Sequence, residues 1–385
     1  MFKRKIKVFF IAQYKAGIDK FESVVREMQK DDKFDVKVLA VPDNINDLFN
    51  SKDYEFWYNK FGNITIDSYE GNKWFDLKKL KPDYVFIQRP YDMYVPYEYK
   101  KTTLITYTKV CYIPYGYALA NIFDITFTLD DMRSMNIVFA EHDEAANYYK
   151  KLKEELNDGV TRKIVSLGFP SLDEFKKKVE SGVSAFRNIK NKNGINVLWT
   201  PRWTTDKTAV ETSFFDYKDS IIDCCKGSKN INLVFRPHPL TFNNFIEKEL
   251  MTEKEVKTYL DKFKGNLYYD NSNSYIDTFK ETDVLITDFT SIIPEFFLFN
   301  KPIIYTQKDT YKKLKQIEKL EKSFYRVKNQ KELNKVLDKL QKGEDSLKEI
   351  RKQLIKEIFK DYDGKVSYRI KEYIKEDYKN NFFWK

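Results

Sequence analysis

Cysteine and histidine are scarce in this 385-residue chain, with three and two copies. Cys111 stands alone and Cys224 is adjacent to Cys225, so the spacing matches neither a disulfide framework nor a zinc site. Reduced cysteines in a cytosolic protein are the simplest interpretation. Disulfide and zinc chemistry are therefore set aside.

Long apolar runs and several well-known catalytic motifs are also absent. No stretch approaches the roughly 18–20 apolar residues of a membrane-spanning helix. Near the start, basic residues precede the five-residue run VFFIA without a small-residue cleavage site, which predicts a first β-strand and not a signal peptide. The chain has no Gly-rich loop of the P-loop or dinucleotide type and no Gly-x-Ser-x-Gly elbow. Proteins that depend on those motifs are therefore excluded.

Positive charge exceeds negative charge: 68 Lys and Arg stand against 58 Asp and Glu, for a net charge of +10. Such an excess permits an anionic partner such as a nucleotide, a nucleic acid, a phosphorylated polymer or an anionic lipid. Charge alone favours an ordinary solvated, Lys-rich surface. Lysine outnumbers arginine, which argues against dedicated nucleic-acid recognition, and we expect no nucleic-acid partner.

Short apolar runs alternate with helix-like segments along the chain. This β–α–β alternation predicts parallel sheets covered by helices. The expected strands cover residues 8–12, 36–41, 84–88, 109–115, 125–129, 137–141 and 163–168, and then 195–201, 232–239, 266–270, 283–288 and 302–306.

A polar stretch at residues 176–194 separates the two series of strands. The length of the chain also favours two domains. We predict an α/β protein with two doubly wound, Rossmann-like domains, 1–175 and 176–385, facing a cleft, with amphipathic helices at the end of the second domain. Ligands of such sheets bind beyond the carboxyl ends of the strands, so the chemistry is expected there.

The segment FRPHPL, residues 235–240, follows a predicted strand and holds one of the two histidines. Prolines fix the backbone on both sides of His238. If strand geometry continues, Arg236 and His238 point to the same side. A guanidinium and a titratable imidazole together suit a phosphate, so we predict an anion site here. A packing histidine in a rigid turn is the alternative.

A second candidate anion site follows the strand at 283–288. Thr290 and Ser291 come just after Asp288, where a helix is expected to begin, and Glu295 lies about one turn further along. Hydroxyls and backbone N–H groups at a helix N-terminus bind anions. A plain N-cap is the alternative interpretation.

Two further segments of the second domain carry candidate ligand groups. Arg202 follows the strand at 195–201 and can hold a phosphate. The polar loop 269–275 precedes a helix, and its backbone can read a base edge, with a plain turn as the alternative.

In the first domain, residues 111–121 join a strand to an expected helix. Gly116 would let a ligand approach the backbone closely. Tyr115 and Tyr117 can donate to a bound group, although a tyrosine hydroxyl is a poor base near neutral pH. His142, between Glu141 and Asp143 at an expected helix start, is a minor catalytic candidate.

Over residues 80–375 the chain resembles the CDP-glycerol glycerophosphotransferases that polymerise teichoic acids and related capsule polymers. An Arg-x-His-Pro turn, an aspartate–aromatic–Ser/Thr–Ser turn with a later acidic residue, a Lys-Pro-Ile-Ile strand, a Gly-x-Pro-x-x-Asp turn and a closing Asp-Gly…Arg-Ile helix carry the resemblance. In this sequence they are Arg236–Pro239; Asp288, Phe289, Thr290, Ser291 and Glu295; Lys301–Ile304; Gly168, Pro170 and Asp173; and Asp363, Gly364, Arg369 and Ile370.

The resemblance implies a GT-B architecture, with the acceptor on the N-terminal domain and a cytidine-nucleotide donor on the C-terminal domain. It implies that Arg236 and His238 contact the donor phosphates and that Thr290 and Ser291 hold a phosphate. The loop around Asn273 to Tyr275 would lie near the cytosine. His238 would then act as electrophile or general acid on the departing CMP. Arginine, histidine and helix N–H groups would neutralise the pyrophosphate, so we expect no metal and no other cofactor.

One departure concerns the general base. The family's N-domain His-Gly pair appears here as Tyr115-Gly116. Tyr115 and His142 are therefore the catalytic candidates on this side. Other acidic candidates are Asp92, Glu141 and Asp143.

The leading hypothesis is transfer of glycerol phosphate, or a similar polyol phosphate, from a CDP-activated donor to a cell-surface polymer. A GT-B glycosyltransferase using a CMP-, CDP- or UDP-sugar is the alternative. A catalytically silent polymer-binding subunit and a nucleic-acid-binding protein are two further hypotheses. The expected acceptor is an anionic, lipid-linked polymer. The expected location is the cytoplasm, with peripheral attachment at the inner membrane face as a hypothesis.

Overall fold

The computed structural model divides the chain into two compact units. Unit 1 comprises residues 1–174 and 361–385, and unit 2 comprises residues 175–360. The described residues are 4–13, 15–42, 51–117, 127–173, 175, 184–189, 191, 193–206, 211–272, 275–288, 290, 292–306, 317–359 and 362–382.

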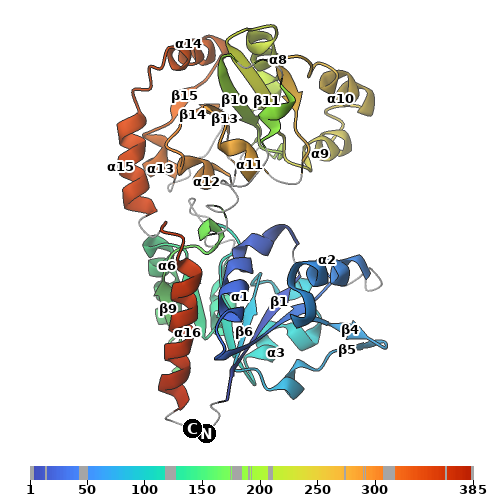
Figure 1. The fold of residues 1–385 in the computed structure, drawn as a ribbon, viewed down its shortest axis with the longest axis vertical. Coiled ribbons are helices and arrows are strands. Elements are labelled where there is room, and N and C mark those ends of the chain that lie inside the picture. The colour runs from blue at the N-terminus through green and yellow to red at the C-terminus, as the bar shows by residue number, and fades with distance from the viewer. Residues whose placement is uncertain are drawn as a thin grey trace. The chain divides into compact units, whose positions relative to one another are not determined.

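Unit 1 is built on a seven-stranded sheet with the order β3-β2-β1-β6-β7-β8-β9, in which every pairing is parallel (Figure 1). The strands are β1 (Ile6–Ala12), β2 (Phe34–Ala40), β3 (Thr65–Asp67), β6 (Tyr84–Ile87), β7 (Lys109–Tyr112), β8 (Ile137–Ala140) and β9 (Lys163–Ser166). β4 (Tyr69–Glu70) and β5 (Lys73–Trp74) form a small antiparallel pair. The helices are α1 (Glu22–Gln29), α2 (Ser51–Phe61), α3 (Lys101–Leu104), α5 (Leu129–Arg133), α6 (Asp143–Leu156) and α16 (Val366–Phe382).

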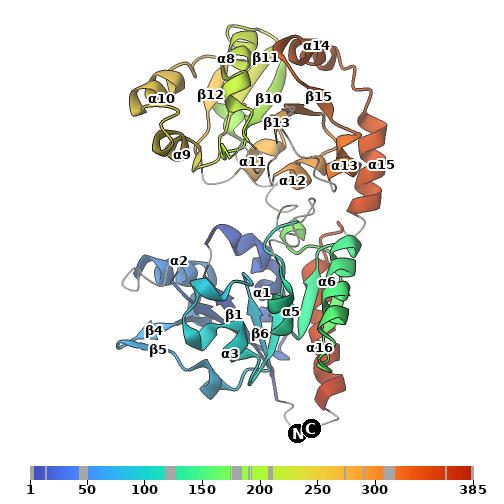
Figure 2. The same ribbon diagram turned by 180° about the vertical axis from the view of Figure 1, so that it is seen from behind.

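Both faces of this sheet are buried, which explains the nearly continuous apolar runs of its strands. Along β1, Val8 and Phe10 point into a core that includes residues of α1, α2 and α16. Phe9 and Ile11 point into a second core with residues of α3, α5 and α6. The two views in Figures 1 and 2 show the helices on either side of the sheet.

Unit 2 has a six-stranded sheet with the order β12-β11-β10-β13-β14-β15, again parallel throughout. Its strands are β10 (Ile195–Thr200), β11 (Ile231–Phe235), β12 (Leu267–Tyr269), β13 (Val284–Thr287), β14 (Ile303–Thr306) and β15 (Tyr325–Val327). Its helices are α8 (Phe214–Cys225), α9 (Thr241–Glu247), α10 (Glu253–Leu260), α11 (Ile276–Phe279), α12 (Ile293–Phe297), α13 (Ile317–Glu321), α14 (Gln330–Gln341) and α15 (Lys348–Ile358). The doubly wound α/β prediction is thus confirmed for both units.

The last helix, α16, belongs to unit 1, so the prediction that residues 361–385 extend the second domain is wrong. Val366, Ile370 and Ile374 recur at four-residue spacing and are buried in the first core of unit 1. Figures 1 and 2 both show α16 running alongside unit 1. The family resemblance implied a closing helix here but not the sheet that it covers.

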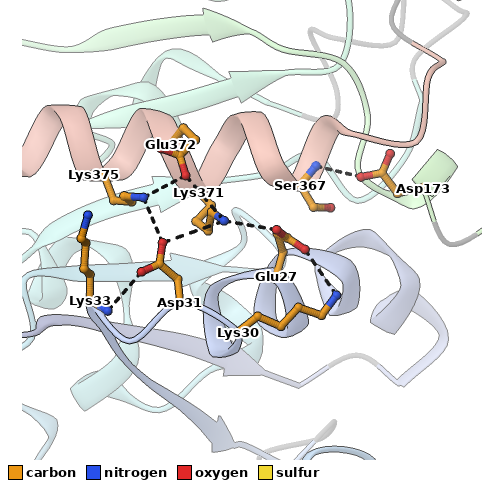
Figure 3. A network of polar contacts seen from close by, with 9 residues as sticks. All are labelled: Glu27, Lys30, Asp31, Lys33, Asp173, Ser367, Lys371, Glu372 and Lys375. Carbon is orange, nitrogen blue, oxygen red and sulfur yellow. Dashed lines mark hydrogen bonds and ion pairs between the residues drawn. The ribbon is translucent and has the colours of Figure 1, made fainter.

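Polar contacts fix α16 against α1, as Figure 3 shows. Lys375 Nζ lies 2.9 Å from Asp31, and Lys371 Nζ lies 3.2 Å from Glu27. At the start of α16, the buried carboxylate of Asp173 accepts hydrogen bonds from the Ser367 N–H at 2.8 Å and the Val366 N–H at 3.2 Å. Two of the first backbone donors of the helix are thereby satisfied.

Asp377, near the C-terminal end of α16, ties that end of the helix to the sheet. Its buried carboxylate accepts hydrogen bonds from Tyr84, Lys109 and Lys163, all at 2.6 Å. These donors begin β6, β7 and β9, so one side chain ties the helix to three strands. Burial by itself raises the pKa of Asp377, but the bonds from both lysines and Tyr84 outweigh it and hold that pKa below its usual value.

The expected strand at 125–129 is not formed, and the strands expected at 109–115 and 232–239 end earlier, at Tyr112 and Phe235. Residues 127–128 are not in a strand, because Thr128 forms a reciprocal capping box with Asp131 at the start of α5; residues 125–126 lie outside the described residues. Residues 125–129 alternate between apolar side chains and threonine, and this pattern wrongly predicted a strand. The edge strands β3 and β15 were not predicted, since three residues are too few for a periodic pattern.

Replacing Asp377 with Asn should destabilise unit 1 at pH 7 by about 2 kcal/mol, since two lysines lose their counter-ion. The loss is less than for a fully buried pair because both lysine side chains reach solvent. A carboxyl group whose pKa is lower in the folded state than in the unfolded state stabilises the folded state at pH values above its unfolded pKa of roughly 3.9. This stabilisation disappears as the pH falls through the lower, folded-state pKa. In urea unfolding, the gap between wild type and variant should therefore close below about pH 4. Equal stability at pH 7, or a shift matched by the exposed control Asp130→Asn, would contradict this.

Candidate functional site

The first candidate site lies in unit 2, where the strand order changes direction. β10 is the first strand of the unit, and its neighbours β11 and β13 lie on opposite sides of it. Ligands of doubly wound sheets bind at such a switch point, outside the carboxyl ends of the strands. Arg202, Arg236, His238 and Asp288 all follow the ends of these three strands.

Asp288 is the buried centre of this edge. One carboxylate oxygen accepts the backbone N–H of Arg202 at 2.6 Å, and the other accepts the N–H and hydroxyl of Ser213 at 2.8 and 3.0 Å. Burial raises the pKa of Asp288, and these hydrogen bonds offset the effect only in part. The side chain thus joins the segment after β10 to the start of α8. We revise its predicted role from ligand contact to positioning of the ligand-binding loops.

Buried threonines continue this polar layer along the strand ends. The Thr287 hydroxyl donates to the Thr200 carbonyl at 2.7 Å and lies 3.1 Å from the Thr290 hydroxyl. The Thr306 hydroxyl lies 2.6 Å from that of Ser213. Adjacent parallel strands end side by side, so a hydroxyl near the end of each one meets its neighbours. These hydroxyls make the carboxyl ends of the strands polar, and they hydrogen-bond to one another and to the backbone.

Arg236 contacts the next loop of unit 2. Its guanidinium donates to the buried carboxylate of Asp270 at 2.6 Å and to the hydroxyl and carbonyl of Ser272 at 3.0 and 2.7 Å. Asp270 follows β12, so this cluster joins the ends of two neighbouring strands. The prediction that Arg236 and His238 share one direction is wrong, because β11 ends at Phe235 and Pro237 follows.

His238 lies instead toward the segment after β10. Its ring stacks on Trp203 with 5.6 Å between centroids, and Nδ1 accepts the Leu240 N–H at 3.2 Å. The neutral ring therefore carries its proton on Nε2. Partial burial, and then the charge of Arg202, lower the pKa of His238. The residue as a whole is exposed, but its ring is partly covered by Trp203, and the lowered pKa favours the neutral, donating form at neutral pH.

The other predicted donor-site residues are only partly covered by the structure. α12 begins at Ile293 with Ile292 as its N-cap, so Thr290 does not cap it and bonds Thr287 instead. Glu295 is buried in the first turn of α12. Tyr275 packs on Phe279 at 5.4 Å. Asn273, Ser274 and Ser291 lie outside the described residues.

The first-domain candidates lie at the carboxyl ends of strands of unit 1. The hydroxyls of Tyr115 and Tyr91 are 2.8 Å apart. Gly116 is exposed, its φ is not left-handed, and an added Cβ would meet no atom within 4 Å. Asp92 accepts the N–H of Lys101 at 2.9 Å and lies 3.5 Å from its ammonium. Asp92 thus supports the start of α3, which argues against its role as a general base.

His142 is the N-cap of α6, and this structural role argues against the prediction that it acts as a general base. Nδ1 accepts the Ala145 N–H at 3.1 Å, so the neutral ring holds its proton on Nε2. While this cap is in place, neither ring nitrogen has a lone pair open to take a proton from a substrate. Tyr117 packs against His142 and Phe169, with centroids 5.1 and 5.6 Å apart. The ring contact places Tyr117, which follows β7, beside His142 at the start of α6.

Sequence patterns missed the partners that hold these groups in place. Ser213, Asp270 and Trp203 in unit 2, and Arg89 and Tyr91 in unit 1, were not singled out. The available signal was position, because Arg89 and Tyr91 follow β6 directly and Asp270 follows β12. Their partners are distant in sequence, so only the fold reveals the pairs.

Comparison with known proteins identifies relatives. The model of the CDP-glycerol:poly(glycerophosphate) glycerophosphotransferase family matches residues 128–376, well over half of the chain. No curated protein sequence matches the chain. Among solved structures, UDP-GlcNAc 2-epimerase from Neisseria meningitidis bound to UDP-GlcNAc has a TM-score of 0.63 at 16% identity, covering 96% of this chain and 100% of that one. The wall teichoic acid polymerase TagF has a TM-score of 0.58 at 13% identity, covering 98% and 90%. At these identities the structural likeness concerns the fold.

Replacing Asp288 with Asn should lower the stability of unit 2 by about 1–3 kcal/mol, because an amide offers one acceptor oxygen where the carboxylate offers two. Either Arg202 or Ser213 would lose its buried acceptor. Urea unfolding followed by tryptophan fluorescence measures the change. The exposed Asp223→Asn on α8 is the matched control, and an equal effect of the two substitutions would refute the role given to Asp288.

Proposed function

The chain belongs to the CDP-glycerol:poly(glycerophosphate) glycerophosphotransferase family, and on this premise we propose that it transfers glycerol phosphate from CDP-glycerol to a cell-surface polymer of teichoic acid or capsule type. It is an enzyme of the transferase class. The family match carries the proposal, since it spans every described donor-site residue from Arg202 to Glu295.

In the proposed reaction an acceptor hydroxyl oxygen attacks the phosphorus that bears glycerol. A new P–O bond forms, the P–O bond to CMP breaks, and CMP leaves with the bond's electron pair. The hydroxyl proton passes to a base or to solvent. The product is a phosphodiester.

We assign the donor phosphates to the edge that carries Arg202 and His238. The guanidinium supplies a fixed positive charge. The Nε2–H of His238 donates to a phosphate oxygen as charge develops on the leaving CMP, and its lowered pKa suits it to donate as a neutral group. Arg236 orders the loop that begins at Asp270, next to residues 273–274, where we expect the cytosine. In this scheme the chain's own donors neutralise the pyrophosphate, and no metal or cofactor takes part.

A glycosyltransferase that uses a CMP-, CDP- or UDP-sugar is the second candidate. Its support is limited to the observation that a protein of similar fold binds a nucleotide sugar, UDP-GlcNAc. The nucleotide preference and the bond formed separate the two candidates, because glycosyl transfer produces a glycosidic bond and no new phosphodiester.

The donor assignment predicts tight binding of CDP and weaker binding of UDP in calorimetric titration. His238→Ala should weaken CDP binding about tenfold, which is the value of one hydrogen bond to a charged group. His142→Ala, the only other histidine substitution that the chain offers, should leave CDP binding unchanged. Release of CMP from CDP-glycerol with phosphodiester formation would support the reaction. Preference for UDP would favour the glycosyltransferase, and the absence of nucleotide binding would refute both.

For the acceptor, we propose an anionic, lipid-linked polymer reached by peripheral attachment at the inner membrane face. The support is the net charge of +10. None of the helices in the described parts of the chain has the length and apolar character needed to cross a bilayer.

This attachment predicts co-sedimentation with anionic phosphatidylglycerol vesicles at about 50 mM salt that falls sharply by about 200 mM, because surface charges are screened. Neutral phosphatidylcholine vesicles are the control. Equal binding to both lipids, or no binding at low salt, would contradict the attachment.

A further inference from the structure

Two neighbouring thiols lie at the end of α8, away from the proposed donor edge. Cys224 and Cys225 are the last two residues of this helix, and their sulfur atoms are 3.6 Å apart and share a hydrogen bond. Ser213 precedes the first residue of the same 12-residue helix, and a rise of 1.5 Å per residue puts about 18 Å between the two ends. The thiols are therefore separate from the groups to which we assign the donor.

The fold holds the two sulfurs together. The Cys225 carbonyl accepts the side-chain amide of Asn266 at 2.6 Å and the N–H of Ser228 at 3.0 Å, which fixes the backbone at the end of the helix. The side chain of Cys225 is buried in the core of unit 2. Cys224 packs on the same core but is partly exposed, so one of the two thiols is open to reagents from solvent.

The two thiols differ in acidity. Their hydrogen bond lowers the pKa of Cys224, and together with burial it raises the pKa of Cys225. Burial and the nearby carboxylates of Asp338 and Asp223 oppose the change at Cys224 without reversing it. Because the thiolate is the nucleophile and the metal ligand, Cys224 reacts first and Cys225 supplies the second sulfur.

A disulfide fits this pair poorly. Consecutive Cα atoms across a trans peptide are about 3.8 Å apart, whereas the Cα atoms of a disulfide usually lie about 4.4–6.8 Å apart. A direct bond between Cys224 and Cys225 would therefore distort the end of α8. An atom placed between the two sulfurs bridges them without this distortion.

The separation of the sulfurs restricts which atom can bridge them. With bonds of about 2.3 Å, the length of a zinc–thiolate bond, two sulfurs 3.6 Å apart subtend an angle of about 100° at the bridging atom. This bent angle disfavours a linear bis-thiolate ion. Zinc needs four ligands, and in the parts of the chain that the structure describes no three His, Cys, Asp or Glu side chains cluster so as to hold a metal ion. A bent centre that takes only two sulfurs from the protein meets both conditions.

We propose that Cys224 and Cys225 form a dithiol site for a trivalent arsenical. Arsenic(III) is a soft, pyramidal centre that prefers thiolate ligands, and an organic arsenical brings carbon as its own third ligand. When the dihydroxy form of such an arsenical reacts, two As–S bonds form and two As–O bonds break. Each thiol proton leaves with a hydroxyl group as water, so arsenic and sulfur keep their oxidation states.

Phenylarsine oxide, titrated into the full chain under native conditions, is the probe. Intact-mass measurement should show one phenylarsenic group per chain. Peptide mapping should then find both Cys224 and Cys225 protected from iodoacetamide. The adduct should survive the monothiol glutathione but dissociate in dimercaptopropanol, because only a dithiol can replace both As–S bonds at once.

Single substitutions separate chelation from ordinary thiol reactivity. Cys224→Ser and Cys225→Ser each leave one thiol of the pair, so binding should weaken about 100-fold or more, because the second bond of a chelate forms at a high effective concentration. Cys111→Ser, which removes the buried thiol of unit 1, is the matched control and should bind like the wild type. Thermal unfolding establishes that each variant is folded. If the buried substitution Cys225→Ser prevents folding, the partly exposed Cys224→Ser decides the test.

Three results would overturn the site: no adduct with the wild type, an adduct that glutathione removes, or a Cys224→Ser variant that binds as tightly as the wild type. Zn²⁺ serves as the comparison ion, and binding of Zn²⁺ as tight as that of the arsenical would overturn the assigned class of ligand. Neither CDP binding nor CMP release enters these readouts, so the outcome is independent of the proposed function.

Discussion

The buried carboxylate of Asp288 is the interaction on which the donor edge of unit 2 depends. It accepts hydrogen bonds from two segments that are far apart in sequence, after β10 and before α8. Because a buried acceptor is costly to leave unpaired, both segments are held in one arrangement. Arg202, and through it the charge near His238, take their places from this contact. The threonine hydroxyls at the neighbouring strand ends complete the same polar layer.

In unit 1 the corresponding constraint is α16. Apolar residues on one side of this helix complete the first core, while Asp377 and Asp173 fasten its two ends. The helix comes from the end of the chain but covers a sheet formed at its beginning. Unit 1 therefore cannot complete its core until the chain has passed through unit 2 and returned. The polar contacts in Figure 3 set the position of the helix along α1.

Both histidines use Nδ1 to accept a backbone N–H, which decides their chemistry in the same way. In its neutral form each ring keeps a proton on Nε2 and acts as a donor. For His238, at the end of β11, this suits a leaving phosphate. For His142, at the start of α6, it argues against one of the general-base candidates that the sequence offered. Near Gly116, burial and the hydrogen bond with Tyr115 raise the pKa of Tyr91, so this hydroxyl keeps its proton at neutral pH.

Local patterns were sufficient for the two α/β units, since strands buried on both faces must be apolar and helices between them must be amphipathic. They also placed Arg236, His238 and Asp288 near the carboxyl ends of strands, although the structure ends these strands at Phe235 and Thr287, before the three residues. Local patterns could not predict which residues pair, because the partners are separated by between 24 and several hundred residues. Examples are Arg236 with Asp270, Tyr91 with Tyr115, and α16 with α1. The sequence by itself determined which residues stand at the strand ends, because local periodicity sets where a strand begins and stops. Only the tertiary structure decided which of them meet, because strand order and helix docking depend on contacts between distant segments.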